Sequence, residues 1–224
     1  MVKSLLFCVL LACTGGVLLA QTVPAAYTFK IGITYDITAP GRNSQMTSWY
    51  SGGSTVGMSA GSKNDMFIVY DMTNKQAVTF MPAQKVYMVM DMEKMKQRME
   101  KMGKSTEPVA AKDYKISKTG KKETIAGYDC EQWLISSSDA KSLVWVSTSV
   151  GINNSQFGES LTTLFQNMPG AGNIPALKDL KGVMLKMETT SLKDNKTVTM
   201  VAKSVNKDGL TFKTDGYKGM TMPG

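Results

Sequence analysis

The chain has 224 residues, a formal net charge of +8 and no histidine. The absence of histidine excludes a Ser-His-Asp or Cys-His catalytic unit and any zinc site with imidazole ligands. The lysines are scattered among acidic residues, as in residues 115–123, so they predict a solvated basic surface and no nucleic-acid partner, with attraction to anionic lipid headgroups as the alternative.

Residues 1–20, "MVKSLLFCVLLACTGGVLLA", have the pattern of a secretory signal peptide. A basic start precedes an apolar run that ends in small residues, so cleavage is expected after Ala20. A retained transmembrane anchor is disfavoured because Gly15-Gly16 interrupts the run. The alternative is a lipobox at residues 10–13, with Cys13 as the lipidated N-terminus. Cleavage and lipidation both export the protein, so a periplasmic or secreted location is expected.

Removal of this leader leaves Cys130 as the one cysteine of the mature chain, which excludes an intramolecular disulfide. Residues 21–224 must then be held together by an apolar core, and about 200 residues are enough to build one. Because no repeat and no long linker divides the chain, we expect a single domain and a monomer.

The first predicted element is a strand at residues 27–37, "YTFKIGITYDI". Apolar residues alternate with other residues throughout, which is typical of a half-buried strand in a large curved sheet. Residues 51–62, "SGGSTVGMSAGS", are expected to form a loop, and they lack the spacing of a phosphate-binding loop.

Short apolar runs separated by turn residues predict antiparallel strands along much of the remaining chain. These runs are residues 66–72, 76–82, 85–91, 128–136, 142–148, 183–192, 196–205 and 210–214. The first three runs predict a meander, and the polar turn "SSDAK" joins the fourth run to the fifth.

Two stretches, residues 91–102 and 157–168, have helical periodicity instead. The apolar stripe of the first is Met92, Met95, Met99 and Met102, and that of the second is Leu161, Leu164, Phe165 and Met168. Asp91 is a suitable N-cap for the first helix. The order of elements predicts a mainly β (α+β) fold, in which one large antiparallel sheet is covered on one face by two amphipathic helices.

Several phrases resemble a family of exported bacterial proteins of unknown function. They are "KKETIAGYDCEQWLI", "LVWVSTSVGI", "GVMLKMETT" and "FKTDGYKGM", which follow one another between residue 121 and residue 220. The resemblance covers residues 115–224 and extends weakly over the methionine-rich meander. It implies a fold like that of the periplasmic lipoprotein carriers of the LolA and LolB type: an open, curved antiparallel half-barrel whose concave apolar face is covered by helices. The family supplies no catalytic residues.

Methionine is abundant in residues 87–102, "YMVMDMEKMKQRMEKM". Three interpretations are open. The helical stripe can pack on a core, or it can cover a pocket for varied apolar chains, because methionine is flexible and polarizable. The third is Cu(I) binding, since thioethers are soft ligands, Met88, Met90 and Met92 form a Met-x-Met-x-Met run, and Met220 and Met222 form another pair.

No enzyme is predicted. Cys130 lies in a predicted strand without a basic neighbour, which favours a buried structural thiol. Ser138 and Lys141 have the Ser-x-x-Lys spacing of penicillin-binding enzymes, but Ser138 lies in a turn and the Lys-Thr-Gly motif precedes it instead of following it.

The sequence therefore predicts an exported, non-enzymatic protein, without cofactor or resident metal, that holds a lipidic or other apolar ligand between a curved sheet and a helical lid. The candidate contact residues are Phe29, Ile31, Ile33, Met88, Met90, Met92, Met95, Met99, Met102, Trp145, Leu161, Leu164 and Phe165. The alternatives are a structural or interaction protein of the cell envelope, with an envelope protein as partner, and a methionine-based Cu(I) binder.

Overall fold

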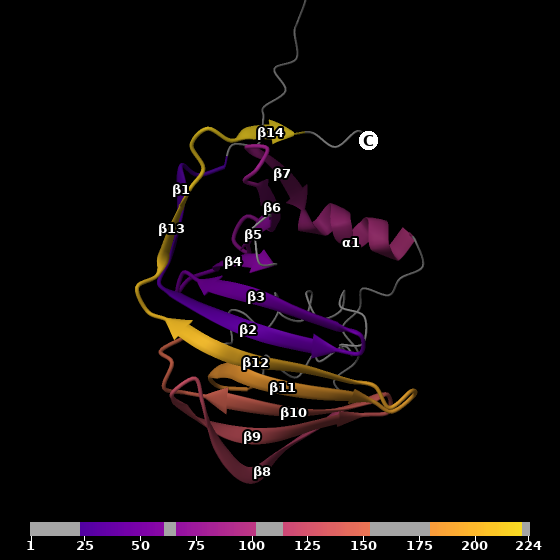
Figure 1. Ribbon diagram of the computed structural model, residues 1–224. Helices are drawn as coiled ribbons and strands as arrows, with labels where there is room; N and C mark the ends of the chain where they lie inside the picture. The colour runs from indigo at the N-terminus through magenta and orange to yellow at the C-terminus, as the bar shows by residue number, and fades with distance from the viewer. Residues whose placement is uncertain (1–22, 61–65, 102–113, 153–179, 221–224) are drawn as a thin grey trace, which may run out of the picture.

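The computed structural model describes residues 23–60, 66–101, 114–152 and 180–220 (Figure 1). The elements are β1 (Ala26–Phe29), β2 (Ile31–Ala39), β3 (Arg42–Tyr50), β4 (Thr55–Ala60), β5 (Met66–Asp71), β6 (Gln76–Met81), β7 (Val86–Asp91), α1 (Met92–Lys101), β8 (Tyr114–Ile125), β9 (Tyr128–Ser137), β10 (Ala140–Ser147), β11 (Val183–Ser191), β12 (Thr197–Asn206), β13 (Leu210–Lys213) and β14 (Lys218–Met220). They form a 12-stranded sheet and a two-stranded sheet, which confirms the predicted mainly β fold.

The large sheet is open. Its strand order is β14-β7-β6-β5-β4-β3-β2-β12-β11-β10-β9-β8, so β14 and β8 are its edges. The pair β14–β7 is parallel and the other pairs are antiparallel. Most neighbours in the sheet are neighbours in the chain, because short polar turns connect antiparallel strands. The predicted meander is confirmed as β5, β6 and β7.

Residues 27–37 do not form the single predicted strand. The chain bends at Lys30, where β1 leaves the large sheet and pairs with β13, whereas β2 stays in the large sheet beside β12. Gly209 permits the bend on the partner segment: its φ is 75°, and a Cβ there would collide with the carbonyl oxygen of Phe29. In Figure 1 the β1–β13 ribbon runs along one side of the molecule, from the start of β2 toward β14.

This ribbon closes one face of β4–β7 with an aromatic cluster. Its buried members are Tyr27, Phe29, Phe67, Val69, Val78 and Phe80, with Phe212, Tyr217 and other residues packed around them. The ring centroids of Phe67 and Phe212 are 4.4 Å apart, and those of Phe80 and Phe212 are 4.9 Å apart. The bend therefore brings side chains from both ends of the chain onto the same surface of the sheet.

A second, larger cluster occupies the other part of the sheet. Ile33, Val144 and Leu185 in this cluster are fully buried, and Tyr35 donates a hydrogen bond of 2.8 Å to the carbonyl oxygen of Met184. The cluster joins residues of β2, β3 and β4 to residues of β9–β12, so it holds the two halves of the sheet together.

Residues 51–62 are not a loop throughout, because they contain β4. Val56 and Met58 are buried on one face of this strand. Gly57, between them, faces the aromatic cluster, where a Cβ would lie 2.8 Å from the Phe29 ring and 2.7 Å from the Phe67 ring. Gly57, one of the glycines that make this stretch resemble a loop, therefore permits close packing of β4 against the aromatic rings.

α1 follows β7 directly, and Asp91 is the N-cap that the sequence predicts. Its Oδ1 accepts hydrogen bonds from the backbone N–H groups of Glu93, at 2.9 Å, and Lys94, at 3.0 Å. The predicted cover of two helices is not supported. α1 is the one helix of the described segments, and it extends from the end of β7 instead of crossing the sheet (Figure 1).

The physical reason lies in the sequence of α1, "MEKMKQRMEK", in which methionine is the one apolar residue type and charged residues predominate. Such a helix has too narrow an apolar stripe to cover a sheet. Residues 157–168, the second predicted helix, lie outside the described residues. In the segments that the structure describes, no helix has the length and apolar character needed to cross a bilayer.

Candidate functional site

One face of β5–β7 is apolar and only partly covered. Residues that are partners across neighbouring strands point to the same face of a sheet. The pairings of β5, β6 and β7 therefore place one set of alternating side chains together, which we call the methionine face. Its members are Met66, Ile68, Tyr70, Ala77, Thr79, Met81, Val86, Met88 and Met90.

Apart from the buried Ala77, these side chains retain exposed surface. Met66 is 42% exposed, and the others are half-buried. Contiguous apolar surface of this kind on a folded chain commonly marks a contact site. The methionine face is therefore the part of the described structure that is best suited to receive an apolar ligand.

The opposite face of β5 and β6 is closed, and the half-buried Tyr87 and Val89 of β7 pack against the same aromatic cluster. Phe80 is fully buried there, with its ring centroid 6.0 Å from that of Tyr27 and 5.2 Å from that of Tyr217. Phe67 and Val78 are buried as well. Because protein interiors are close-packed, a ligand on this side would have to displace the β1–β13 ribbon.

The methionine face is uncharged. Tyr70 is its one ionisable member, and burial raises the pKa of this phenol. The polar groups of the face are this hydroxyl and that of Thr79. A surface of this composition binds by burial of apolar area and provides almost no electrostatic selectivity.

The structure places three predicted methionines at or beside this face. Met88 and Met90 are members of it, and Met92, which is half-buried, begins α1 directly after β7. Other candidates lie outside the described residues or side chains: Met95, Met99, Met102, Leu161, Leu164 and Phe165. The predicted contact residues did not include Met66, Met81 or Ile68. The alternation of residues in 66–72 and 76–82 could have indicated that these three side chains share a face with Met88 and Met90.

The candidates from the predicted first strand are separated. Phe29 lies in the aromatic cluster, 2% exposed, with its ring centroid 5.9 Å from that of Phe67. Ile33 is fully buried in the larger cluster, and Ile31 packs against that cluster. The bend at Lys30 therefore divides the proposed contact surface, and these three residues do not share one cavity wall.

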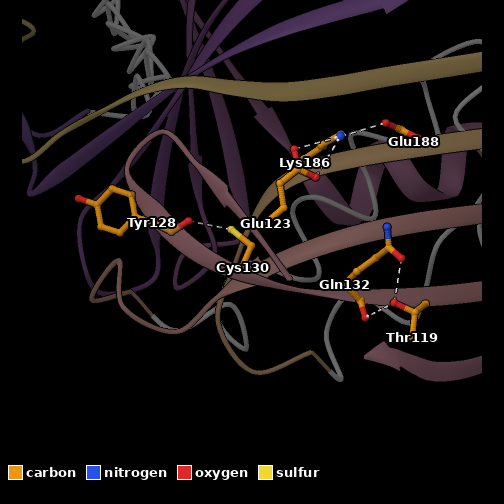
Figure 2. A network of polar contacts seen from close by, with 7 residues as sticks. All are labelled: Thr119, Glu123, Tyr128, Cys130, Gln132, Lys186 and Glu188. Atoms are coloured by element: carbon orange, nitrogen blue, oxygen red, sulfur yellow. Dashed lines mark hydrogen bonds and ion pairs between the residues drawn. The ribbon is translucent and has the colours of Figure 1, made fainter. Parts of the chain in front are cut away.

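Trp145 lies in β10, far from β5 in the strand order. It is 5% exposed, and the Lys186 ammonium lies 4.1 Å from its ring centroid. This ammonium also forms ion pairs with Glu123, at 3.3 Å, and Glu188, at 3.2 Å (Figure 2). Burial opposes the charge of Lys186, but the two carboxylates outweigh burial and raise its pKa. The arrangement ties β11 to β8 and covers the tryptophan.

Cys130 lies close to this network, and the predicted buried position is confirmed. The residue is 2% exposed, and its thiol donates a hydrogen bond of 3.4 Å to the carbonyl oxygen of Tyr128 (Figure 2). Burial raises the pKa of the thiol to about 11. Thiolates, not thiols, are nucleophiles, so Cys130 is not an activated nucleophile near neutral pH.

A concavity of about 510 Å³ lies beside β8 and β9. It is lined by Lys118, Lys122, Asp129, Cys130, Glu131, Trp133, Val146, Thr148 and Lys181. Lys118 pairs with Glu131 at 2.7 Å and lies 4.9 Å from the centroid of Trp133. With both signs of charge at its rim, this concavity is less suited to an apolar chain than the methionine face.

Within the described segments, no group of three or more cysteine, aspartate or glutamate side chains could hold a metal ion. The metal ligands that the methionine face does offer are thioether sulfur atoms, which are softer than carboxylate oxygens.

The structure thus defines a class of protein with an open, mainly antiparallel sheet. At β4–β7 a bent ribbon closes one face of this sheet, and at β5–β7 the other face is partly exposed. Residues 29–207 match the model of a family described as a domain of unknown function (DUF4412), and the chain belongs to that family. The family resemblance predicted from the sequence is confirmed, and the match begins well before residue 115.

A comparison with curated protein sequences gives no match. Among solved structures, the chain is similar to PNGF-II, with 16% identity and a TM-score of 0.42 over 81% of this chain and 28% of that one. It is similar to MucB in the Pseudomonas aeruginosa MucA/MucB complex, with 11% identity and a TM-score of 0.44 over 81% of this chain and 51% of that one.

A LolA superfamily protein from Nitrosomonas europaea is 12% identical, with a TM-score of 0.28 over 82% of this chain and 87% of that one. The chain spans about half the length of the MucB chain and less than a third of that of PNGF-II.

Proposed function

We propose that this is an exported, non-enzymatic binding protein that holds an apolar chain of lipidic character against the methionine face. The observation that carries the proposal is the asymmetry of β5–β7: one face is closed by the aromatic cluster, whereas the other presents contiguous apolar side chains with exposed surface. Export rests on the signal-peptide pattern of residues 1–20.

The energetics favour long, unbranched ligands. Each buried methylene group contributes about 0.8 kcal/mol, so affinity should rise about fourfold with every methylene that reaches the face. The flexible side chains of Met66, Met81, Met88 and Met90 can adapt to a chain of variable shape without a fixed polar anchor. The ligand class is therefore set by apolar length and not by a headgroup.

An acylated ligand should be detectable directly. Native mass spectrometry of protein purified from its own envelope, followed by solvent extraction, should find a stoichiometric lipid or acylated peptide. A fluorescent fatty-acid probe should bind the delipidated protein, with affinity that increases along a series of chain lengths.

A matched pair of variants locates the site. Met88→Glu places a charge on the methionine face and should abolish probe binding, because a carboxylate cannot be desolvated against an acyl chain at low cost. Leu192→Glu places the same charge at a side chain that is 42% exposed in the β11–β12 turn, and binding should be unchanged. Circular dichroism of both variants establishes that they are folded.

Apo protein from the envelope that also fails to bind the probe would overturn the proposal. The protein would then be better explained as an interaction protein of the envelope. Equal loss of binding in both variants would place the probe elsewhere and would also contradict the assignment to this face.

A further inference from the structure

The pairing of β14 with β7 brings a methionine from the end of the chain onto the methionine face. Met220 is the register partner of Met88, and the two strands run parallel. Adjacent strands lie about 4.8 Å apart, and paired residues point to the same face. Gly219, which precedes Met220, faces the other side, where a Cβ would lie 3.1 Å from the Tyr87 hydroxyl. The side chain of Met220 therefore lies on the face that carries Met88.

A third thioether lies next to this pair. Met81 in β6 is the partner of Val86, which is two residues from Met88 in β7, so Met81 and Met88 are diagonal neighbours on one face. Such neighbours are about 7–8 Å apart, within reach of long side chains. Each methionine is unbranched with three rotatable bonds, so the three sulfur atoms can turn toward one point.

From this register we infer that Met81, Met88 and Met220 form a thioether site for a soft monovalent cation, Cu(I). Thioethers suit Cu(I), whereas carboxylate and carbonyl oxygens suit Mg²⁺ or Ca²⁺ and imidazole suits Zn²⁺. The chain has no histidine, and no carboxylate belongs to the methionine face. The site thus selects by ligand softness and not by charge.

The position of the site makes it accessible. β14 is an edge strand and Met220 is 46% exposed, so an ion can reach the sulfur atoms without opening the core. Lys218, on β14, is exposed and is the partner of Val86. Its charge opposes any cation, but the interaction is screened in solution and does not affect the ligand preference.

This site goes beyond the proposed function, although it shares Met88 with it. The two can be separated chemically, because leucine preserves the apolar surface of methionine but has no sulfur. Substitution of Met88 and Met220 by leucine should therefore weaken cation binding much more strongly than it weakens binding of the fatty-acid probe.

The test is a titration of the full chain, carrying ¹³C-labelled methionine methyl groups, with Ag⁺ as a redox-inert substitute for Cu(I), followed by titration with Cu(I) under anaerobic reducing conditions. The methyl resonances of Met81, Met88 and Met220 should shift together and saturate at one equivalent. Methyl shifts report thioether binding, so metal held by the Cys130 thiol does not produce this result.

The double variant M88L/M220L should bind Ag⁺ at least about tenfold more weakly, because loss of even an outer partner of a metal ligand commonly costs 10–100-fold. Met58→Leu is the matched control, since Met58 is 5% exposed in β4, and it should bind as the parent chain does. Unchanged Ag⁺ affinity in the double variant, or methyl shifts confined to other methionines, would overturn the site. Retention of this signal by protein that binds no lipid probe would support the cation site and contradict only the proposed function.

Discussion

The close approach of the β1–β13 ribbon to the large sheet can be tested at Gly57. In Gly57→Ala the new methyl group would lie 2.7 Å from the Phe67 ring and 2.8 Å from the Phe29 ring, and both rings are buried. Contacts this short require the ribbon or the rings to move. Overpacking of a closed core costs roughly 1–3 kcal/mol, and each kcal/mol lowers the Tm of a domain of this size by about 2–4 °C.

The assay is urea unfolding of the parent chain and the variant, supported by thermal unfolding. Gly53→Ala is the control, because a Cβ at Gly53 would meet only the Ser51 hydroxyl, at 3.7 Å. It should change the free energy of unfolding by less than about 0.5 kcal/mol. In the double variant with Phe29→Leu, the shorter side chain should relieve part of the strain, so the two effects should not add.

Equal stability of the Gly57→Ala and Gly53→Ala variants would refute the packing of the ribbon on this face. Strict additivity with Phe29→Leu would contradict the specific contact. The folded Gly57→Ala variant should also keep its affinity for the fatty-acid probe, because Gly57 faces away from the proposed ligand surface.

Three further predictions follow from buried or capping groups. Phe80→Ala should destabilise the protein by about 3–5 kcal/mol in urea unfolding, since Phe80 is fully buried, whereas Leu192→Ala, at an exposed position, should cost less than about 1 kcal/mol. Asp91→Ala should lower the free energy of unfolding by about 1 kcal/mol and reduce the helical circular-dichroism signal, because two backbone N–H groups of α1 lose their acceptor. If neither the free energy of unfolding nor the helical signal changes, Asp91 is not a stabilising N-cap. Burial raises the pKa of the Cys130 thiol from 9.0 to about 11, so its contribution to stability is complete below pH 9.0 and is lost as the pH rises through about 11. In the Cys130→Ala variant the free energy of unfolding should therefore decrease less over this pH range than in the parent chain. An identical pH profile in the two proteins would refute the contribution of the thiol.

Alternation of apolar residues was enough to predict most of the strands, including the meander and the strands near the C-terminus. It could not predict the bend at Lys30, because the alternation continues through Phe29 and Ile31 without interruption. The residue that permits the bend, Gly209, lies in the partner segment, far along the chain. Local periodicity contains no information about such a partner.

The same limit applies to the candidate site. Met88 and Met90 could be predicted because they alternate in one short run. The position of Met220 beside Met88 could not be predicted, since it depends on a parallel pairing between β7 and a three-residue strand. The predicted helical cover is not supported for a related reason: α1 has amphipathic spacing, but a stripe of methionine alone among charged residues does not determine that a helix lies across a sheet.

The abundance of methionine does not by itself identify a function. Met184, Met187 and Met200 are almost fully buried in the larger cluster, where they fill space as other apolar residues do. Met66 and Met220, in contrast, are 42% and 46% exposed on or beside one face of the sheet. Exposure and strand register, and not composition, therefore distinguish the methionines of the proposed binding surface from those of the core. Leucine substitution should distinguish the two roles of the exposed methionines, because an acyl chain requires only apolar surface whereas a soft cation requires sulfur.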